Sequence, residues 1–338
     1  MQTKYQIHAQ SQIEKNKAKC GDSFAYTETE SGYLLAAVSD GVGSKPCDWL
    51  ASKTTCEKFM ELTGKKLEKG FEPTDLISIC TETDKFVSNP PLECKGMMAV
   101  LSAVVWNMQQ RFVDFVNIGD SRIYKLTAND ELHQISTDEL KAVIMRKPNG
   151  KPELTNGSAI VRAGLTNAFG VGTVQINPQH CEFLPGDTLF LASDGFYDCH
   201  SSFENDLRTI AHALDLSEPT AKIFKFYQNY QNDDATLLIL RNHTFDTAAQ
   251  NLTESNYSEL KGKLPKFRLC EIMNERLEAE ILQKNKNAAL ATLAIMETEH
   301  LLPTKTMLDA LLQTMKTNNF TDGAVFGGIV RLIKETMK

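Results

Sequence analysis

The chain has little of what would mark a membrane protein, an exported protein or a nucleic-acid-binding protein. No apolar run in its 338 residues approaches the ~18 residues expected of a membrane span. The first ten residues, MQTKYQIHAQ, lack the apolar stretch of a signal peptide, so we expect a cytoplasmic location unless a signal-less secretion route exports the protein. The formal net charge of −7 gives no general attraction to nucleic acid or to anionic lipid.

Closely spaced cysteine pairs are also absent. The eight cysteines are scattered along the chain, and none forms a C-x-x-C pair. In a chain of this length, such a pattern is typical of free buried thiols rather than of a disulfide framework or a zinc site. We therefore predict free thiols, including the three near the motifs described below, Cys20, Cys47 and Cys199.

The first part of the chain has a mixed character. Up to about residue 240, short runs rich in β-branched and aromatic residues recur, and several alternate with polar residues as half-buried strands do. Helical spacing is clearest over 47–66 and 72–87. The stretch 137–180 has weak periodicity and several Gly and Pro residues, which is typical of a loop-rich insertion.

The last part of the chain has a different character. From about residue 245 the strand signals stop, and apolar residues recur at helical spacing around 269–277 and 307–315. We therefore predict an α+β domain over residues 1–242, followed by a small all-α domain over residues 243–338. The apolar stripes of this helical domain indicate packing within its own bundle or onto the α+β domain, and the sharper hypothesis is that it selects a protein partner or a substrate.

Two apolar runs end in the same three residues, Ser-Asp-Gly. LLAAVSDG places Asp40 and Gly41 after the first run, and LFLASDG places Asp194 after the second. An aspartate beside a hydrophobic core is costly unless it is paired, hydrogen-bonded or bound to a cation. Three further aspartates flank predicted strands in the same way, and they are Asp22, Asp120 and Asp233.

Carboxylates that neighbouring strands bring together repel one another unless a cation neutralises them. All-oxygen donors suit Mg²⁺ or Mn²⁺ better than zinc, and Gly41 has no side chain to prevent its carbonyl from turning towards an ion. An aspartic-protease pair of Asp40 and Asp194 is excluded, because glycine rather than a hydroxyl-bearing residue follows each aspartate. The two Ser-Asp-Gly corners are therefore predicted to hold metal ions.

The motifs occur in a fixed order along the chain. They are DGVGS (40–44), GMMAVL (96–101), NIGDSRIYKL (117–126), GDTLFLASDGFYD (186–198) and DDATLLIL (233–240). This set resembles the metal-dependent serine/threonine protein phosphatases of type 2C, over residues from about 5 to 242. The resemblance implies a four-layer α-β-β-α sandwich of two antiparallel sheets. It also implies a signalling hydrolase that removes phosphate from phosphoproteins with Mg²⁺ or Mn²⁺.

The resemblance further implies roles for individual residues. Asp40 would bridge two ions, and the Gly41 carbonyl would complete one coordination sphere. Asp194 and Asp233 would hold the other ion, so Asp40, Asp194 and Asp233 are the predicted catalytic residues. Asp120, with Asp194, would form a third and weaker metal position. Because the ions activate water for in-line displacement, no covalent nucleophile is needed.

The N-terminal motif departs from the family pattern. Lys17 stands where the family has an arginine that grips the substrate phosphate, and a lysine lacks the bidentate fork of that arginine. Asp22 matches the last residue of the family's Asn-Glu/Gln-Asp motif and would act on a metal directly or through water. Cys20 and Gly21 replace the Asn-Glu/Gln pair before it, which removes a carboxylate or an amide from beside the metals.

Two further departures bear on activity. Val42 stands where some relatives carry a histidine, and Asp234 replaces an asparagine. The three predicted catalytic aspartates are all present, which favours an active Mg²⁺- or Mn²⁺-dependent serine/threonine phosphatase. The alternative is a weakly active or inactive relative that acts by binding a partner through its helical domain.

Overall fold

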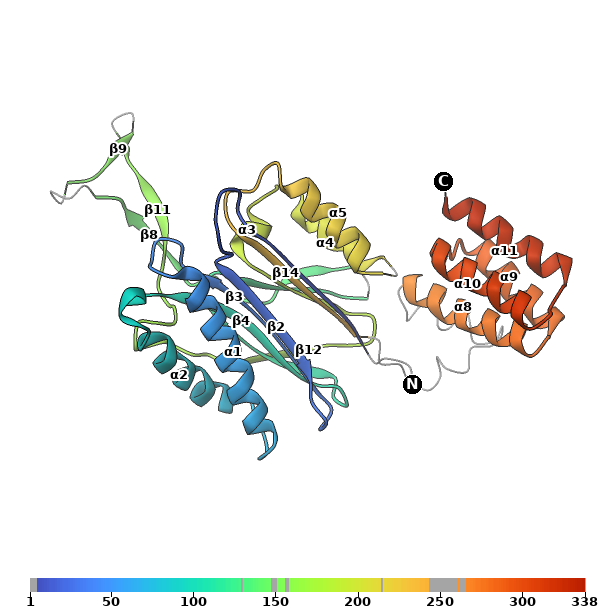
Figure 1. The fold of residues 1–338 in the computed structure, drawn as a ribbon, viewed down its shortest axis with the longest axis horizontal. Coiled ribbons are helices and arrows are strands. Elements are labelled where there is room, and N and C mark those ends of the chain that lie inside the picture. The colour runs from blue at the N-terminus through green and yellow to red at the C-terminus, as the bar shows by residue number, and fades with distance from the viewer. Residues whose placement is uncertain are drawn as a thin grey trace.

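A computed structural model describes residues 5–128, 130–146, 151–155, 158–213, 215–242, 261 and 266–337 (Figure 1). Two five-stranded sheets form its centre, and all neighbouring strands in them are antiparallel. The first sheet has the order β1 (Tyr5–Gln12), β14 (Ala235–Asn242), β13 (Thr188–Ala192), β6 (Arg122–Leu126), β7 (Leu132–Gln134). The second has the order β12 (Gln179–Glu182), β5 (Phe112–Ile118), β4 (Ala99–Asn107), β3 (Tyr33–Gly41), β2 (Asp22–Glu28).

Helices cover the outer face of each sheet. The second sheet is covered by α1 (Asp48–Leu67) and α2 (Asp75–Ser88), and the short 3-10 helix η1 (Leu92–Cys94) follows them. The first sheet is covered by α3 (Asp194–Tyr197), α4 (Phe203–Ala211) and α5 (Ser217–Tyr227). The helices predicted over 47–66 and 72–87 are thus confirmed as α1 and α2.

Strand β3 shows why the fold has four layers. Successive side chains of a strand point to opposite faces of the sheet. Leu35 and Ala37 therefore join the core under α1 and α2, whereas Leu34, Ala36 and Val38 join the core between the sheets. Both faces of this strand are buried, which explains its nearly continuous apolar run. The predicted α-β-β-α sandwich is confirmed.

The stretch that the sequence indicated to be a loop-rich insertion contains strands. Two antiparallel strand pairs extend from the sandwich: β8 (Leu140–Ile144) pairs with β11 (Val161–Leu165), and β9 (Leu154–Thr155) pairs with β10 (Ser158–Ala159). Their backbones pair, but most of their side chains are exposed. Because these strands have no buried face, they lack the alternation of apolar and polar residues from which a strand is predicted.

The C-terminal part is helical, as predicted. Its helices are α8 (Lys266–Leu282), α9 (Lys286–Thr298), α10 (Lys305–Thr317) and α11 (Gly323–Thr336). They share a core of their own, in which Met273, Leu293 and Ile329 are buried. The predicted domain boundary at 242/243 borders residues 243–260, which lie outside the described residues. Within the described ranges, no helix combines the length and the apolar character required to cross a bilayer.

The prediction that the cysteines are all free thiols is wrong for one pair. Cys47, directly before α1, forms a disulfide with Cys94 at the end of η1, with the two Cα atoms 5.4 Å apart. Cys20 and Cys199 are free. The spacing of 47 residues gives no sign of the pair, because the packing of α1 and η1 on the same sheet brings the two thiols together.

Candidate active site

Two pairs of neighbouring strands bring the predicted aspartates to one edge of the sandwich. Asp22 on β2 lies directly opposite Asp40 on β3. Asp194 follows β13 by two residues, and Asp233 precedes β14 by two residues; these strands are antiparallel neighbours, so the two positions lie at the same end. Ser193 connects the two sheets, because its hydroxyl donates a 2.7 Å hydrogen bond to Oδ2 of Asp22. The same hydroxyl accepts the backbone N–H of Thr236 on β14 at 2.9 Å.

The carboxyl groups at this edge affect one another's ionisation. Burial raises the pKa of Asp40 well above its usual range, and the charges of Asp22 and Asp194, with a hydrogen bond to Asp194, add to the shift. Burial also raises the pKa of Asp194, where the charge of Asp233 acts in the same direction. The pKa of Asp22 is raised to about 8, mainly by burial. Burial and the charge of Asp194 raise the pKa of Asp120 to about 6. The structure therefore places the five aspartates that the sequence singled out near enough for their charges to act on one another.

The glycine of each Ser-Asp-Gly corner is required by a close backbone contact. A Cβ atom on Gly41 would lie 2.1 Å from the carbonyl oxygen of Asp48, at the start of α1. A Cβ atom on Gly195 would lie 2.0 Å from the carbonyl oxygen of Asp234. Neither glycine has a positive φ, so the reason is space rather than backbone conformation. The freedom of the Gly41 carbonyl to turn towards an ion stays a prediction beside this contact.

Asp234 is a site residue whose role the sequence analysis missed. Its carboxylate accepts the backbone N–H groups of Glu14 and Gly21, each at 2.6 Å, and the ammonium of Lys17 at 2.8 Å. The side chain is 1% exposed. Asp234 therefore fixes the loop between β1 and β2 to the start of β14. The sequence signals were that a second aspartate follows Asp233 and that it replaces the asparagine of the family pattern.

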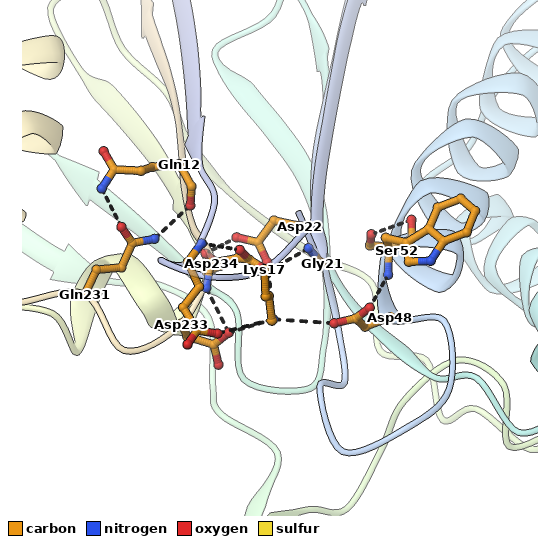
Figure 2. A network of polar contacts seen from close by, with 12 residues as sticks. Gln12, Lys17, Gly21, Asp22, Asp48, Ser52, Gln231, Asp233 and Asp234 are labelled. Atoms are coloured by element: carbon orange, nitrogen blue, oxygen red, sulfur yellow. Dashed lines mark hydrogen bonds and ion pairs between the residues drawn. The ribbon is translucent and has the colours of Figure 1, made fainter. Parts of the chain in front are cut away.

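Lys17 lies among carboxylates that belong to different segments. Figure 2 shows it between Asp48 on one side and Asp233 and Asp234 on the other. Its Nζ atom is 3.4 Å from Asp48, 3.4 Å from Asp233 and 2.8 Å from Asp234. Burial alone would lower the pKa of Lys17, but the hydrogen bond to Asp234 and the three negative charges raise it overall. The ammonium is therefore charged, and its side chain is still about one-quarter exposed (27%).

Two buried carboxylate oxygens at this edge test whether a cation would fit. Oδ1 of Asp22 and Oδ1 of Asp194 are buried and have no hydrogen-bond partner among the described residues. Among all the residues that the structure describes, no three His, Cys, Asp or Glu side chains are grouped closely enough to hold a metal ion by themselves. Mg²⁺ keeps several of its waters and binds proteins through one or two carboxylates, so a complete cage is not required. The oxygen donors therefore suit a hydrated divalent cation.

The greater part of the chain matches a known protein family. A family profile described as protein phosphatase 2C matches residues 9–238, which is more than half of the chain. The chain belongs to the protein phosphatase 2C family. The predicted resemblance is thus confirmed. Among curated proteins, none matches the chain in a sequence comparison.

Solved structures of protein phosphatases share the fold. The serine/threonine phosphatase PstP/Ppp of Mycobacterium tuberculosis is 20% identical with a TM-score of 0.55, over 71% of this chain and 99% of that chain. The catalytic domain of PstP in complex with two manganese ions is 20% identical with a TM-score of 0.52, over 70% and 97%. The S. agalactiae serine/threonine phosphatase is 17% identical with a TM-score of 0.53, over 70% and 99%. At these identities the likeness concerns the fold of the sandwich.

Proposed function

We propose that this protein is a Mg²⁺- or Mn²⁺-dependent serine/threonine phosphatase that hydrolyses phosphomonoesters on phosphoproteins. The observation that carries the proposal is the convergence of Asp40, Asp194 and Asp233 at one edge of the sandwich, where burial and mutual charge raise the pKa of the first two. A cluster that suppresses its own ionisation in this way gains most from a cation. Membership of the protein phosphatase 2C family supports the same activity.

The residues would divide the binding of two ions among them. Asp40, on β3, would hold the ions, together with the Gly41 carbonyl beside it. Asp194 and Asp233 would also hold an ion, and Asp120, whose pKa is raised by burial and by the charge of Asp194, would contribute to a third position. The chemistry supplied by such a pair of ions, when bound, is the activation of water and the neutralisation of phosphoryl oxygens. The catalytic domain of PstP, solved in complex with two manganese ions, supports a site for two ions.

The chain's own groups would prepare the site for substrate. Ser193 donates a hydrogen bond to Oδ2 of Asp22, while Oδ1 of that carboxylate is buried and has no hydrogen-bond partner among the described residues. Lys17 supplies a fixed positive charge beside Asp233, where a phosphate group that approaches the metal edge would meet it. This arrangement supports the predicted phosphate-binding role of Lys17, although the lysine provides a point charge rather than a fork.

The first experiment is hydrolysis of para-nitrophenyl phosphate with and without Mn²⁺. The wild-type protein should show turnover that depends on Mn²⁺, and Asp194→Asn should lower kcat/KM by roughly 100-fold or more, as expected when a charge-stabilising group is lost. Asp309→Asn, an exposed position on α10, is the matched control and should keep full turnover. Metal-independent turnover, or full activity in Asp194→Asn, would contradict the proposal.

The cellular setting stays a prediction. A cytoplasmic signalling role, phosphoprotein substrates and a protein partner for the helical domain are all consistent with the proposed activity. The disulfide adds one condition, because thiols in the cytosol are normally kept reduced. There, Cys47 and Cys94 would be a pair of neighbouring thiols, so the location of the protein decides their state.

A further inference from the structure

The loop between β1 and β2 carries a glycine, Gly21, next to the aspartates at the edge of the sandwich. Gly21 directly precedes Asp22, and the family motif carries a glutamate or a glutamine there. The φ angle of Gly21 is not in the left-handed region, so the backbone at this position would accept a side chain. Backbone conformation therefore does not explain why residue 21 is a glycine.

Space beside Gly21 is taken by carboxylates from two other segments. A Cβ atom on Gly21 would lie 3.0 Å from Oδ2 of Asp48 and 3.0 Å from Oδ2 of Asp234. Asp234 reaches this space from the start of β14, and Asp48 reaches it from the first turn of α1 (Figure 2). An acidic group is thus present beside residue 21, but the chain supplies it from elsewhere in the fold.

Asp48 contacts two parts of the site at once. Its Oδ2 atom lies 3.4 Å from the ammonium of Lys17, on the side opposite Asp233 and Asp234. Its backbone carbonyl packs against Gly41, the residue after the predicted bridging aspartate. Its Oδ1 atom accepts the backbone N–H of Trp49 at 2.8 Å, which holds the carboxylate in one orientation.

We propose that Asp48 is a positioning residue for Lys17, and that its carboxylate replaces the acidic or amide side chain that residue 21 lacks. The inference rests on the proposed phosphatase function, in which Lys17 meets the substrate phosphate. Without Asp48, the ammonium would be held by its other carboxylate partners alone, of which the buried Asp234 is the nearest at 2.8 Å, followed by Asp233 and Glu14. With Asp48 on the opposite side, the ammonium stays between the start of α1 and the start of β14.

A general effect of an acidic residue at a helix start has to be separated from this role. Carboxylates in the first turn stabilise a helix through its dipole, wherever the helix lies. Asp75 provides the matched case, because it opens α2 and pairs with Lys66 at 3.1 Å. The side chains of Asp48 and Asp75 are both 20% exposed. Asp75→Asn therefore removes a comparable charge from a helix that does not contact Lys17.

The test compares Asp48→Asn, Asp48→Ala and Asp75→Asn with the wild type. The readouts are kcat and KM for para-nitrophenyl phosphate with Mn²⁺, and the inhibition constant of inorganic phosphate. Both Asp48 variants should raise KM and the phosphate inhibition constant by about fivefold, the upper range for a partly exposed ion pair, with little change in kcat. Asp75→Asn should change neither. Unchanged phosphate inhibition in both Asp48 variants, or an equal effect in Asp75→Asn, would overturn the proposal.

Replacement of the missing side chain gives a second and sharper test. Gly21→Glu alone should lower the melting temperature and weaken phosphate inhibition, because the new carboxylate meets those of Asp48 and Asp234. Combined with Asp48→Ala, which vacates part of the space, Gly21→Glu should restore phosphate inhibition towards the wild-type value. If the double variant is no better than the single variants, Asp48 does not stand in for residue 21.

The two proposals can fail separately. A wild-type protein without metal-dependent turnover would end the proposed function, whatever Asp48 does. The melting temperatures of Gly21→Glu, Asp48→Ala and the double variant form a cycle that needs no activity. A double variant that melts above Gly21→Glu alone supports the shared space, and additive losses contradict it.

Discussion

The backbone carbonyl of Asp48 packs against the α-carbon of Gly41 so closely that no side chain fits between them. A Cβ atom there would lie 2.1 Å from the carbonyl oxygen. Asp234 makes the same contact with Gly195 in the other Ser-Asp-Gly corner, at 2.0 Å. The carboxylates of Asp48 and Asp234 both contact Lys17. The two Ser-Asp-Gly corners and the ammonium are thus held together by the same two residues.

Gly41→Ala should therefore displace the start of α1. A methyl group at this position must push the Asp48 carbonyl away, and overpacking of this kind costs up to about 3 kcal/mol of unfolding free energy. Mn²⁺-dependent turnover should fall together with stability, because Asp40 is the neighbouring residue. Urea unfolding and turnover of para-nitrophenyl phosphate measure the two effects.

Gly43→Ala is the control for the same loop. A Cβ atom on Gly43 meets nothing within 4 Å, and its φ is not positive. Its free energy of unfolding should therefore stay within about 0.5 kcal/mol of the wild-type value. Equal destabilisation by Gly41→Ala and Gly43→Ala would show that the contact with Asp48 is not the cause.

Asp234→Ala should detach the loop between β1 and β2 from β14. The substitution leaves the N–H groups of Glu14 and Gly21 and the ammonium of Lys17 without their shared acceptor. Removal of one partner from a buried charged network costs about 3 kcal/mol or more. Asp234→Asn keeps one acceptor oxygen and should cost clearly less. Chemical denaturation of both variants checks this order, and the reverse order would contradict the anchoring role.

Reduction of the Cys47–Cys94 disulfide should destabilise the protein. The bond closes a loop with a sequence separation of 47 residues, and restriction of the unfolded chain by such a loop is worth about 4 kcal/mol in the chain-entropy estimate. The measurement is urea unfolding with and without a dithiol reductant. A Cys47→Ala/Cys94→Ala double variant should be insensitive to the reductant. A wild-type protein that is equally insensitive would show that the bond does not form.

Removal of the helical domain should leave small-substrate turnover intact. Its buried residues form a core of their own, separate from the three cores of the sandwich. A chain that ends at residue 242 should therefore keep kcat/KM for para-nitrophenyl phosphate within about twofold, as expected of a domain with an independent core. Circular dichroism establishes that the shortened chain is folded. Loss of turnover in a folded chain would show that the helices contribute to the site.

The sequence by itself determined the strand-rich character of the first part of the chain, the helical end and the aspartates that flank the strands. Strand β3 is recognisable because both of its faces are buried, and Asp40 and Asp194 stand out because a charge directly follows an apolar run. These are local signals, since burial and charge leave their mark on adjacent positions. The strand pair β8 and β11 shows no such pattern in the sequence, because its side chains are mostly exposed.

Only the tertiary structure decided which distant residues meet. The pairing of Cys47 with Cys94, the anchoring of the N-terminal loop by Asp234 and the approach of Asp48 to Gly21 all join separate segments. Neither residue type nor spacing encodes such contacts, because they depend on how α1 and β14 are placed against the sheet edge. The missing side chain at Gly21 was visible in the sequence, but the carboxylate that occupies its space was not.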